Sequence, residues 1–186
     1  MLEPRDERRL LDALATGDRQ AAETLVERTY AQTYRSLCRL TGGDAELAAD
    51  LTQDTYRRAW IAIADFDRRS RFTTWLFRIA YTTFLNHIRR PKRVESIDDH
   101  AIEHIERDER EPNAEDRAHE NERDSRLRRA VLALPDNLRF TVTARYWGEQ
   151  SVADIAKATS VTGAAIRKRL KKAHHILQLA LEEDAA

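Results

Sequence analysis

Apolar residues recur at helical spacing along most of the 186-residue chain, and strand-like alternation is nowhere sustained. The N-terminal part indicates two or three helices, with breaks at Thr16-Gly17-Asp18 and Thr41-Gly42-Gly43. A long helix is predicted over about 44–64, and another over about 72–90 where aromatic and aliphatic side chains share one stripe. The pattern therefore predicts an all-α protein.

The periodicity fades after Pro91 and resumes near Arg126, which divides the chain into three parts. Proline disfavours helix in the residue before it, and residues 91–125 carry 6 basic against 13 acidic side chains with few aromatics. Such a composition cannot bury enough apolar surface to offset chain entropy. We predict two small helical domains, over 1–90 and 126–186, joined by a flexible acidic linker over 91–125.

The second domain contains a helix-turn-helix pattern. Ser151 followed by Asp154 is a capping box that begins a short helix, and Thr162 can cap the helix after the turn. In this motif the second helix enters the major groove of duplex DNA, where its first turns meet base edges and its later cations meet phosphates. The candidate duplex-binding residues are Thr162, Ala165, Arg167, Lys168, Arg169, Lys171 and Lys172.

The formal net charge is zero, but the charges are segregated. The stretch 66–93 has eight basic residues and one acid, Asp67, and its cations alternate with aromatic side chains. Single-stranded nucleic acid is bound in this way, through stacking on rings and attraction of the backbone to positive charge. Each aromatic taken alone is the better candidate for a core, whereas Arg78 and Tyr81 share another face and are better candidates for nucleic acid.

A polar stripe runs along the predicted helix 44–64. Asp50, Gln53, Asp54 and Arg57 follow one another at i, i+3, i+4 and i+7 and therefore share one helix face. A solvated face and a protein-docking surface would look alike at this spacing.

Two other functions are compatible with parts of the sequence, namely a metal-dependent hydrolase and a repressor or activator. His100, Glu103 and His104 match the spacing of some zinc peptidases, but their acidic setting offers neither a third ligand nor a dry pocket. We therefore expect no enzyme activity, no metal and no cofactor. The main alternative is a repressor or activator that uses the N-terminal helices to sense a ligand or to dimerise. It would need a self-complementary surface and a two-fold DNA site.

The chain offers no sign of export. Its start lacks the apolar segment of a signal peptide, and Cys38 is its single cysteine. We expect a soluble cytoplasmic protein without membrane insertion.

Two signatures resemble those of a known family. The first is DLTQDTYRRAW from Asp50, followed by F-x-x-W-L-x-x-I-A from Phe72. The second is the VLALP segment from Val131, leading to I-x-x-R-L-x-x-A from Ile166. In this order the chain resembles an extracytoplasmic-function (ECF) sigma factor of the sigma-70 family, built from two helical promoter-binding domains, sigma regions 2 and 4, and a linker.

This resemblance implies partners and residue roles. The stripe Asp50, Gln53, Asp54 and Arg57 would dock on the clamp helices of the beta-prime subunit of bacterial RNA polymerase core, with a further contact on the beta flap. The helix-turn-helix would read the minus-35 promoter element as duplex. An anti-sigma factor is expected as a further partner, and the free protein is expected to be a monomer.

The loop 65–71 and the following helix would capture the melted minus-10 strand. Thr82, Asn86 and the Gly163-Ala164-Ala165 segment depart from the residues common in the family, so the promoter sequence does not follow from relatives. The candidate minus-10 residues are Arg68, Arg69, Arg71, Phe72, Trp75, Arg78, Tyr81, Thr82, Asn86, Arg89 and Arg90.

Overall fold

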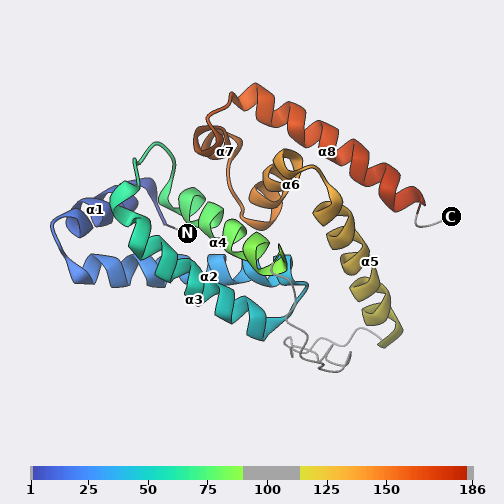
Figure 1. Cartoon of the computed structure of the whole chain (residues 1–186), viewed down its shortest axis with the longest axis horizontal. Coiled ribbons are helices and arrows are strands. Elements are labelled where there is room, and N and C mark those ends of the chain that lie inside the picture. The colour runs from blue at the N-terminus through green and yellow to red at the C-terminus, as the bar shows by residue number, and fades with distance from the viewer. Residues whose placement is uncertain (1, 90–113, 184–186) are drawn as a thin grey trace.

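The computed structural model describes residues 2–89 and 114–183, and this part of the chain is helical with no strand (Figure 1). The element order confirms the all-α prediction. The elements are α1 (Pro4–Ala15), α2 (Arg19–Thr41), α3 (Ala45–Ala62), the 3-10 turn η1 (Ile63–Asp65), α4 (Phe72–Arg89), α5 (Ala114–Ala133), α6 (Asp136–Val142), the π-helical turn η2 (Thr143–Trp147), α7 (Val152–Thr159) and α8 (Gly163–Glu183).

Helices α1 to α4 form an N-terminal unit whose breaks follow the sequence signals. Asp18 accepts hydrogen bonds from the first turn of α2, and Asp44 does the same for α3. Gly42 ends α2 in the left-handed conformation, with φ 79°. The unit has a core of its own, whose buried members are Leu2, Leu11, Leu25, Tyr56, Ala59, Phe66, Phe72 and Leu76.

Helices α5 to α8 form a C-terminal unit. Helix α5 begins at Ala114, inside the segment 91–125 that the sequence predicted to be a linker. The remainder of that segment, with His100, Glu103 and His104, lies outside the described residues. The buried side chains of this unit's own core are Val131, Leu134, Leu138, Val142, Ala173 and Leu177.

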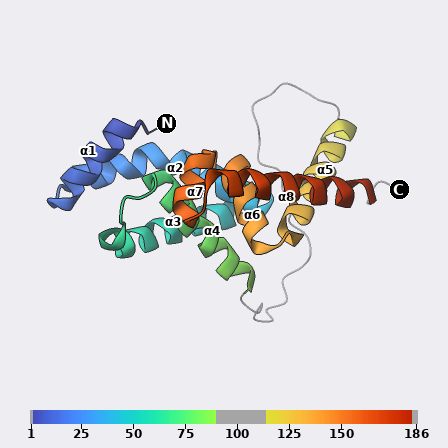
Figure 2. The same cartoon turned by 90° about the horizontal axis from the view of Figure 1, so that it is seen from above.

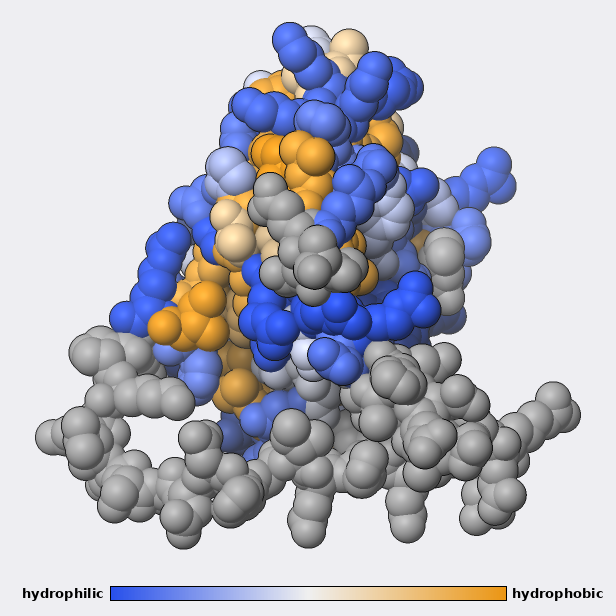
Figure 3. Space-filling model, turned by 90° about the vertical axis from the view of Figure 1, so that its right-hand side faces the viewer, coloured by the Kyte–Doolittle hydropathy of each residue, from blue (hydrophilic) through white to orange (hydrophobic). Residues whose placement is uncertain are grey.

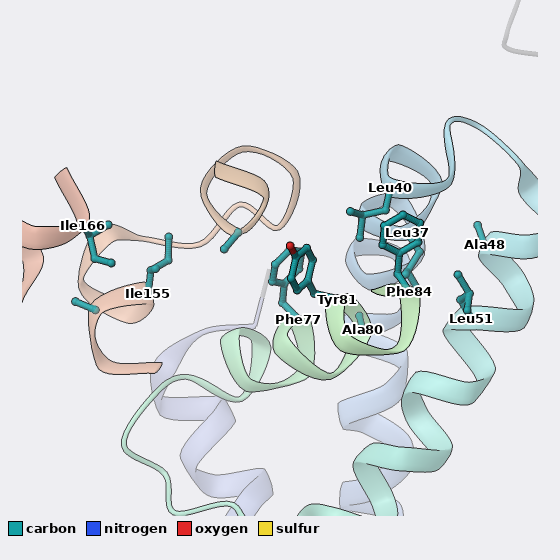
Figure 4. Packing of buried hydrophobic residues seen from close by; sticks show 12 residues of the cluster. Leu37, Leu40, Ala48, Leu51, Phe77, Ala80, Tyr81, Phe84, Ile155 and Ile166 are labelled. Atoms are coloured by element: carbon teal, nitrogen blue, oxygen red, sulfur yellow. The ribbon is translucent and has the colours of Figure 1, made fainter. Parts of the chain in front are cut away.

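The two units pack against each other through a third, shared apolar cluster. Helix α4 lies between the other N-terminal helices and the C-terminal unit, and contacts α7 and η2 (Figures 1 and 2). Figure 4 shows Phe77 and Tyr81 of α4 between Ile155 on one side and Leu37 on the other. The buried residues of this cluster are Leu37, Leu40, Ala48, Leu51, Phe77, Ala80, Tyr81, Phe84, Ala144, Ile155, Ala156 and Ile166.

Polar groups of α2 bind the backbone where η2 ends. The last carbonyls of a helix have no partner within the helix and attract positive charge. Gln32 Nε2 donates to the Gly148 carbonyl at 2.9 Å, and Ser36 Oγ donates to the Trp147 carbonyl at 2.9 Å. Arg39 adds longer hydrogen bonds to the Trp147 and Tyr146 carbonyls, at 3.3 and 3.4 Å. One face of α2 thus completes the hydrogen bonding of an element far away in the sequence.

A second contact joins α4 to the loop after η2. Thr74 Oγ1 donates to the side-chain carbonyl of Gln150, and both residues are buried. Gly148 lies against the Phe77 ring so closely that a Cβ atom there would be 2.6 Å from the ring. The two units therefore meet at a site that admits no side chain on residue 148.

The surface carries apolar side chains among hydrophilic ones. From the right-hand side of Figure 1, an apolar strip runs between hydrophilic areas (Figure 3). Exposed large apolar residues include Ile61 of α3, Leu127 of α5 and Leu179 of α8. Among the described residues, no helix combines the length and hydrophobicity that crossing a membrane requires.

Gly148→Ala should weaken the contact between the units. Gly148 has φ −85° and ψ −7°, which alanine adopts without strain, so the effect should come from the clash with Phe77. Overpacking of this kind costs about 1 to 3 kcal/mol. Small-angle scattering should report a larger radius of gyration, with helical content by circular dichroism retained.

Gly163→Ala is the matched control. A Cβ atom at Gly163 would meet nothing nearer than 3.8 Å, so this change should leave the scattering curve as it is. Identical scattering curves for Gly148→Ala and the unaltered chain would contradict the described interface.

Candidate nucleic-acid interface

Helix α8 divides into a buried and a cationic face. Ile166 and Ala173 are fully buried at i and i+7 and hold the helix against α7 and α6. The cations that point away from this core are mostly exposed, and Arg169 is half-buried. The exposed cations of α8 are Arg167, Lys168, Lys171 and Lys172.

The turn before α8 has the predicted capping. Ser151 Oγ accepts from the Asp154 amide at 3.0 Å, and Thr162 Oγ1 accepts from the Ala165 amide at 3.1 Å. Ser160 ends α7 in the left-handed conformation, with φ 55°. The caps fix the start of each helix, so the exposed beginning of α8 has a defined direction relative to α7.

The candidate residues of α4 that face outward form a stripe. Trp75, Thr82 and Asn86 follow at i, i+7 and i+11, with Trp75 half-buried and the other two exposed. The Trp75 ring lies 4.9 Å from the Phe66 ring and 5.7 Å from the Phe72 ring, measured between centroids. A fixed aromatic edge beside exposed hydroxyl and amide groups is suited to stacking and hydrogen bonding with unpaired bases.

On α3, the polar stripe faces away from the core. Asp50, Gln53 and Arg57 are exposed, and Asp54 is half-buried. Asp54 accepts hydrogen bonds from Arg58 Nε at 2.7 Å and from Arg57 Nη2 at 2.5 Å. Burial raises the pKa of Asp54, but the two guanidinium groups outweigh it and hold this pKa below its usual value. The stripe therefore keeps its negative charge fixed beside two cations.

A model of sigma-70 region 2 matches residues 25–94, which span α2 to α4. The ECF RNA polymerase sigma factor SigM of Mycobacterium tuberculosis H37Rv is 31% identical over 169 residues, covering 91% of this chain and 81% of the relative. Bacillus subtilis SigM is 30% identical over 145 residues, covering 78% and 85%. The chain belongs to the ECF RNA polymerase sigma factors.

Other relatives and solved structures extend the likeness over nearly the whole chain. RNA polymerase sigma-H factor of Pseudomonas aeruginosa is 29% identical over 194 residues, covering 98% of this sigma factor and 97% of the relative. CnrH, solved in complex with the cytosolic domain of CnrY, has a TM-score of 0.65 at 22% identity, covering 96% of this chain and 99% of that chain. Bartonella quintana RpoE, solved with the anti-sigma factor NepR, has a TM-score of 0.53 at 20% identity, covering 86% and 96%. Both solved structures therefore have the same fold as this chain.

Family membership favours the sigma-factor hypothesis over the repressor or activator hypothesis. The HxxEH motif of the zinc-peptidase alternative lies in the segment that is not described. Residues 2–89 and 114–183 contain no group of three or more histidine, cysteine, aspartate or glutamate side chains that could hold a metal ion.

Two candidate minus-10 residues of this sigma factor are buried, as the sequence allowed for Phe72 but not for Tyr81. Phe72 is fully buried in the core of the N-terminal unit, so it offers no surface to a base. Tyr81, expected to face nucleic acid, is 5% exposed because Phe140 of the C-terminal unit packs on its ring. Helical spacing separates faces but does not reveal that a second unit covers one of them.

The C-terminal unit also binds two candidate arginines of α4. Arg78 Nη1 donates to the Ala158 carbonyl at 3.1 Å, and Arg89 Nη2 lies 3.8 Å from an Asp136 carboxylate oxygen. Both arginines remain exposed, and Arg90 lies outside the described residues. In this arrangement Tyr81 is covered by the C-terminal unit, whereas Arg78 and Arg89 border the open stripe with Thr82 and reach from its edge to the C-terminal unit.

Sequence reasoning missed the residues that fix the two units and the loop 65–71. Gln32, Ser36 and Gln150 carry no motif, and their role depends on contacts between distant segments. Glu7 did leave a signal, since it precedes Leu11 by four residues and Leu14 by seven, on the apolar stripe of α1. An acid at such a position indicates a buried partner.

Thr162→Ala should lower the free energy of unfolding by about 0.5 to 2 kcal/mol, because the first turn of α8 loses its side-chain acceptor. Thr162→Ser keeps the hydroxyl and should restore most of that loss. Urea unfolding followed by circular dichroism measures both. Equal stabilities of the alanine and serine variants would show that the hydroxyl contributes nothing as a cap.

Proposed function

We propose that this sigma factor binds bacterial RNA polymerase core and directs it to promoters, where it recognises duplex and melted DNA and starts transcription. The observation that carries the proposal is that named sigma factors align with both helical units, with 91% of this chain covered by Mycobacterium tuberculosis SigM. A repressor that used only the helix-turn-helix would have no need for the rest of this pattern.

In this proposal the C-terminal unit reads the minus-35 element as duplex. Exposed Arg167 and Lys168 lie in the first turns of α8, where a helix entering the major groove meets base edges. Lys171 and Lys172 lie one turn later and would meet phosphates. The capped turn at Thr162 supports this geometry because it fixes the approach of the helix.

The N-terminal unit would bind the melted minus-10 strand. Trp75 offers a ring edge, while Thr82 and Asn86 offer hydrogen-bonding groups along the same face. Extruding a base from the duplex costs a few kcal/mol, which stacking and phosphate contacts offset. This face is open in the described arrangement, in contrast to the face with Tyr81.

The α3 stripe is the proposed docking surface for the beta-prime clamp helices, with the beta flap as a second contact for the C-terminal unit. Ile61 follows Arg57 by one turn on α3 and is 73% exposed, which is unusual for so large an apolar side chain. A polar stripe that ends in an exposed apolar anchor is typical of a protein interface.

Full use of α4 on DNA requires the two units to separate. The contact with the C-terminal unit covers Tyr81 and holds Arg78. We infer that core polymerase binds the separated units and thereby shifts the equilibrium toward them, since a partner stabilises the conformation that it binds better. Bartonella quintana RpoE was solved in complex with the anti-sigma factor NepR. A comparable anti-sigma factor of this chain would favour a conformation that cannot bind core.

Run-off transcription with bacterial core polymerase and a library of promoters from the host of this chain tests the proposal. Core with this sigma factor should start at specific promoters where core alone does not. Asp50→Lys with Asp54→Lys should abolish these starts and core binding, because the stripe reverses its charge. Asp50 is exposed, but Asp54 pairs with Arg57 and Arg58, so the variant should also lose about 0.5 to 2 kcal/mol of stability for two partly exposed ion pairs. Circular dichroism should show that its helical content is retained.

Glu23→Lys with Glu27→Lys provides the matched control, since these exposed acids of α2 also lie four residues apart. That variant should transcribe normally. The absence of any start that depends on the unaltered chain would refute the sigma-factor proposal. Full core affinity of the Asp50 and Asp54 variant, measured by fluorescence anisotropy, would instead refute only the docking surface.

The α8 cations should differ in the part of the DNA that they contact, some meeting base edges and others phosphates. Arg167→Ala should cost about 1 to 3 kcal/mol on the preferred minus-35 duplex and little on scrambled duplex, as expected for a base-edge contact. Lys171→Ala should weaken both duplexes alike and lower the salt slope by about 0.9, as expected for one lost phosphate contact. Titration of the full chain at several salt concentrations measures these quantities. Equal losses on both duplexes for Arg167→Ala would assign Arg167 to the phosphates.

A further inference from the structure

The loop between η1 and α4 presents three arginines that the sequence assigned together to the melted strand. Two of them, Arg68 and Arg71, have guanidinium groups that bind α1 and the residues before it. The third, Arg69, has a side chain 79% exposed and pairs with Asp67 of the same loop at 3.1 Å. Two of the three arginines therefore hold the loop against the N-terminal segment, and the third is exposed to solvent.

Arg71 is held at the point where the loop becomes α4. Its Nε donates to Glu7 Oε2 at 2.8 Å, and its Nη2 donates to the Leu2 carbonyl. The other carboxylate oxygen of Glu7 accepts from the Phe72 amide at 2.8 Å, which gives α4 an N-terminal cap from a different helix. Glu7 is 6% exposed, so this carboxylate is fully committed to the loop end.

Arg68 is held in the same manner at the middle of the loop. Its Nη1 pairs with an Asp12 carboxylate oxygen, and its Nη2 donates to the Leu11 carbonyl at 2.9 Å. The Arg68 backbone has φ 57°, in the left-handed region that a residue with a Cβ atom rarely adopts without support. Each of these two arginines thus binds one carboxylate of α1 and one backbone carbonyl of the N-terminal segment.

We propose that α1 is a positioning element for the strand-capturing loop, with Glu7 and Asp12 as its anchors. Arg68 and Arg71 are positioning residues that transmit this placement, and Arg69 is the loop arginine that meets the DNA backbone. The proposal rests on the proposed function for its DNA part only. It assigns a role in strand selectivity to α1, which precedes the matched region at residues 25–94.

Asp12→Asn separates positioning from direct contact because the two roles predict opposite signs. If Arg68 positions the loop, the variant loosens the loop and weakens strand binding by about two- to fivefold, the range expected for one exposed ion pair. If Arg68 contacts phosphate directly, the variant removes a competing anion and binding becomes tighter.

Asp6→Asn is the control. Asp6 lies on the same helix and its carboxylate pairs with Arg28 Nη1 of α2 at 2.9 Å, so the variant makes the same charge change without touching the loop. It should leave loop and binding unchanged. Glu7→Gln, which keeps the side-chain shape, should exceed Asp12→Asn in its effect on the loop.

Two measurements are made on the full chain. Hydrogen exchange of the amides of residues 66–72 reports loop order without DNA and should accelerate in Asp12→Asn and Glu7→Gln but not in Asp6→Asn. The holoenzyme with core polymerase is then given a fluorescent random-sequence pool of single-stranded DNA, and the retained strands are sequenced. Asp12→Asn should weaken the retention of DNA strands by the holoenzyme and should make the retained strands less selective in base sequence. An ion pair that contributed only to the stability of the fold would leave this base preference unchanged.

Unchanged exchange in the loop, or tighter binding by Asp12→Asn, would overturn the proposal. A failure of the unaltered chain to bind core would remove the proposed function, while the exchange experiment would still decide whether α1 holds the loop. Arg69→Ala should weaken retention of all strands alike and lower the salt slope by about 0.7, as expected for one phosphate contact on single-stranded DNA.

Discussion

The described arrangement depends on how the end of η2 meets α2 and α4. The carbonyls of Trp147 and Gly148 would be left without partners by a helix that ends in an apolar contact, and such buried groups cost about 1 to 3 kcal/mol each. Gln32 and Ser36 of α2 donate to these carbonyls, together with Arg39 of α2 and Gln150 of the loop after η2. The same contact brings Gly148 against the Phe77 ring of α4, so these hydrogen bonds and the shared apolar cluster together fix the place of the C-terminal unit.

The shared interface is not optimal in every detail. Burial raises the pKa of the Tyr81 phenol, and the nearby Arg139 guanidinium offsets part of this rise. Within residues 2–89 and 114–183, no hydrogen-bond partner of adequate geometry meets the buried hydroxyl of Tyr81 or that of Thr83. Water would satisfy the phenol if the units separated, which reduces the free energy lost on opening. An interface of this kind suits a contact that a binding partner reverses.

Local chemistry made much of the fold predictable from sequence. The capping box at Ser151 and the breaks at Gly17 and at Gly42-Gly43 mark helix boundaries, and the cation stripe of α8 follows from helical spacing against Ile166. Contacts between distant segments were not predictable. Tyr81 is buried because Phe140 packs on its ring. Arg68 and Arg71 are held in place by two acids of α1. No local sequence pattern relates Phe140 or these acids to α4 and the loop before it.

The position of Glu7 has a practical consequence for chimeras between relatives. A boundary placed at the start of the matched region, residue 25, would replace α1 and so take away the Glu7 carboxylate that pairs with half-buried Arg71. Removing one partner of a buried ion pair is destabilising because the other charge is left without compensation. Grafts that exchange promoter preference should therefore transfer α1 and the loop 65–71 together as one matched pair.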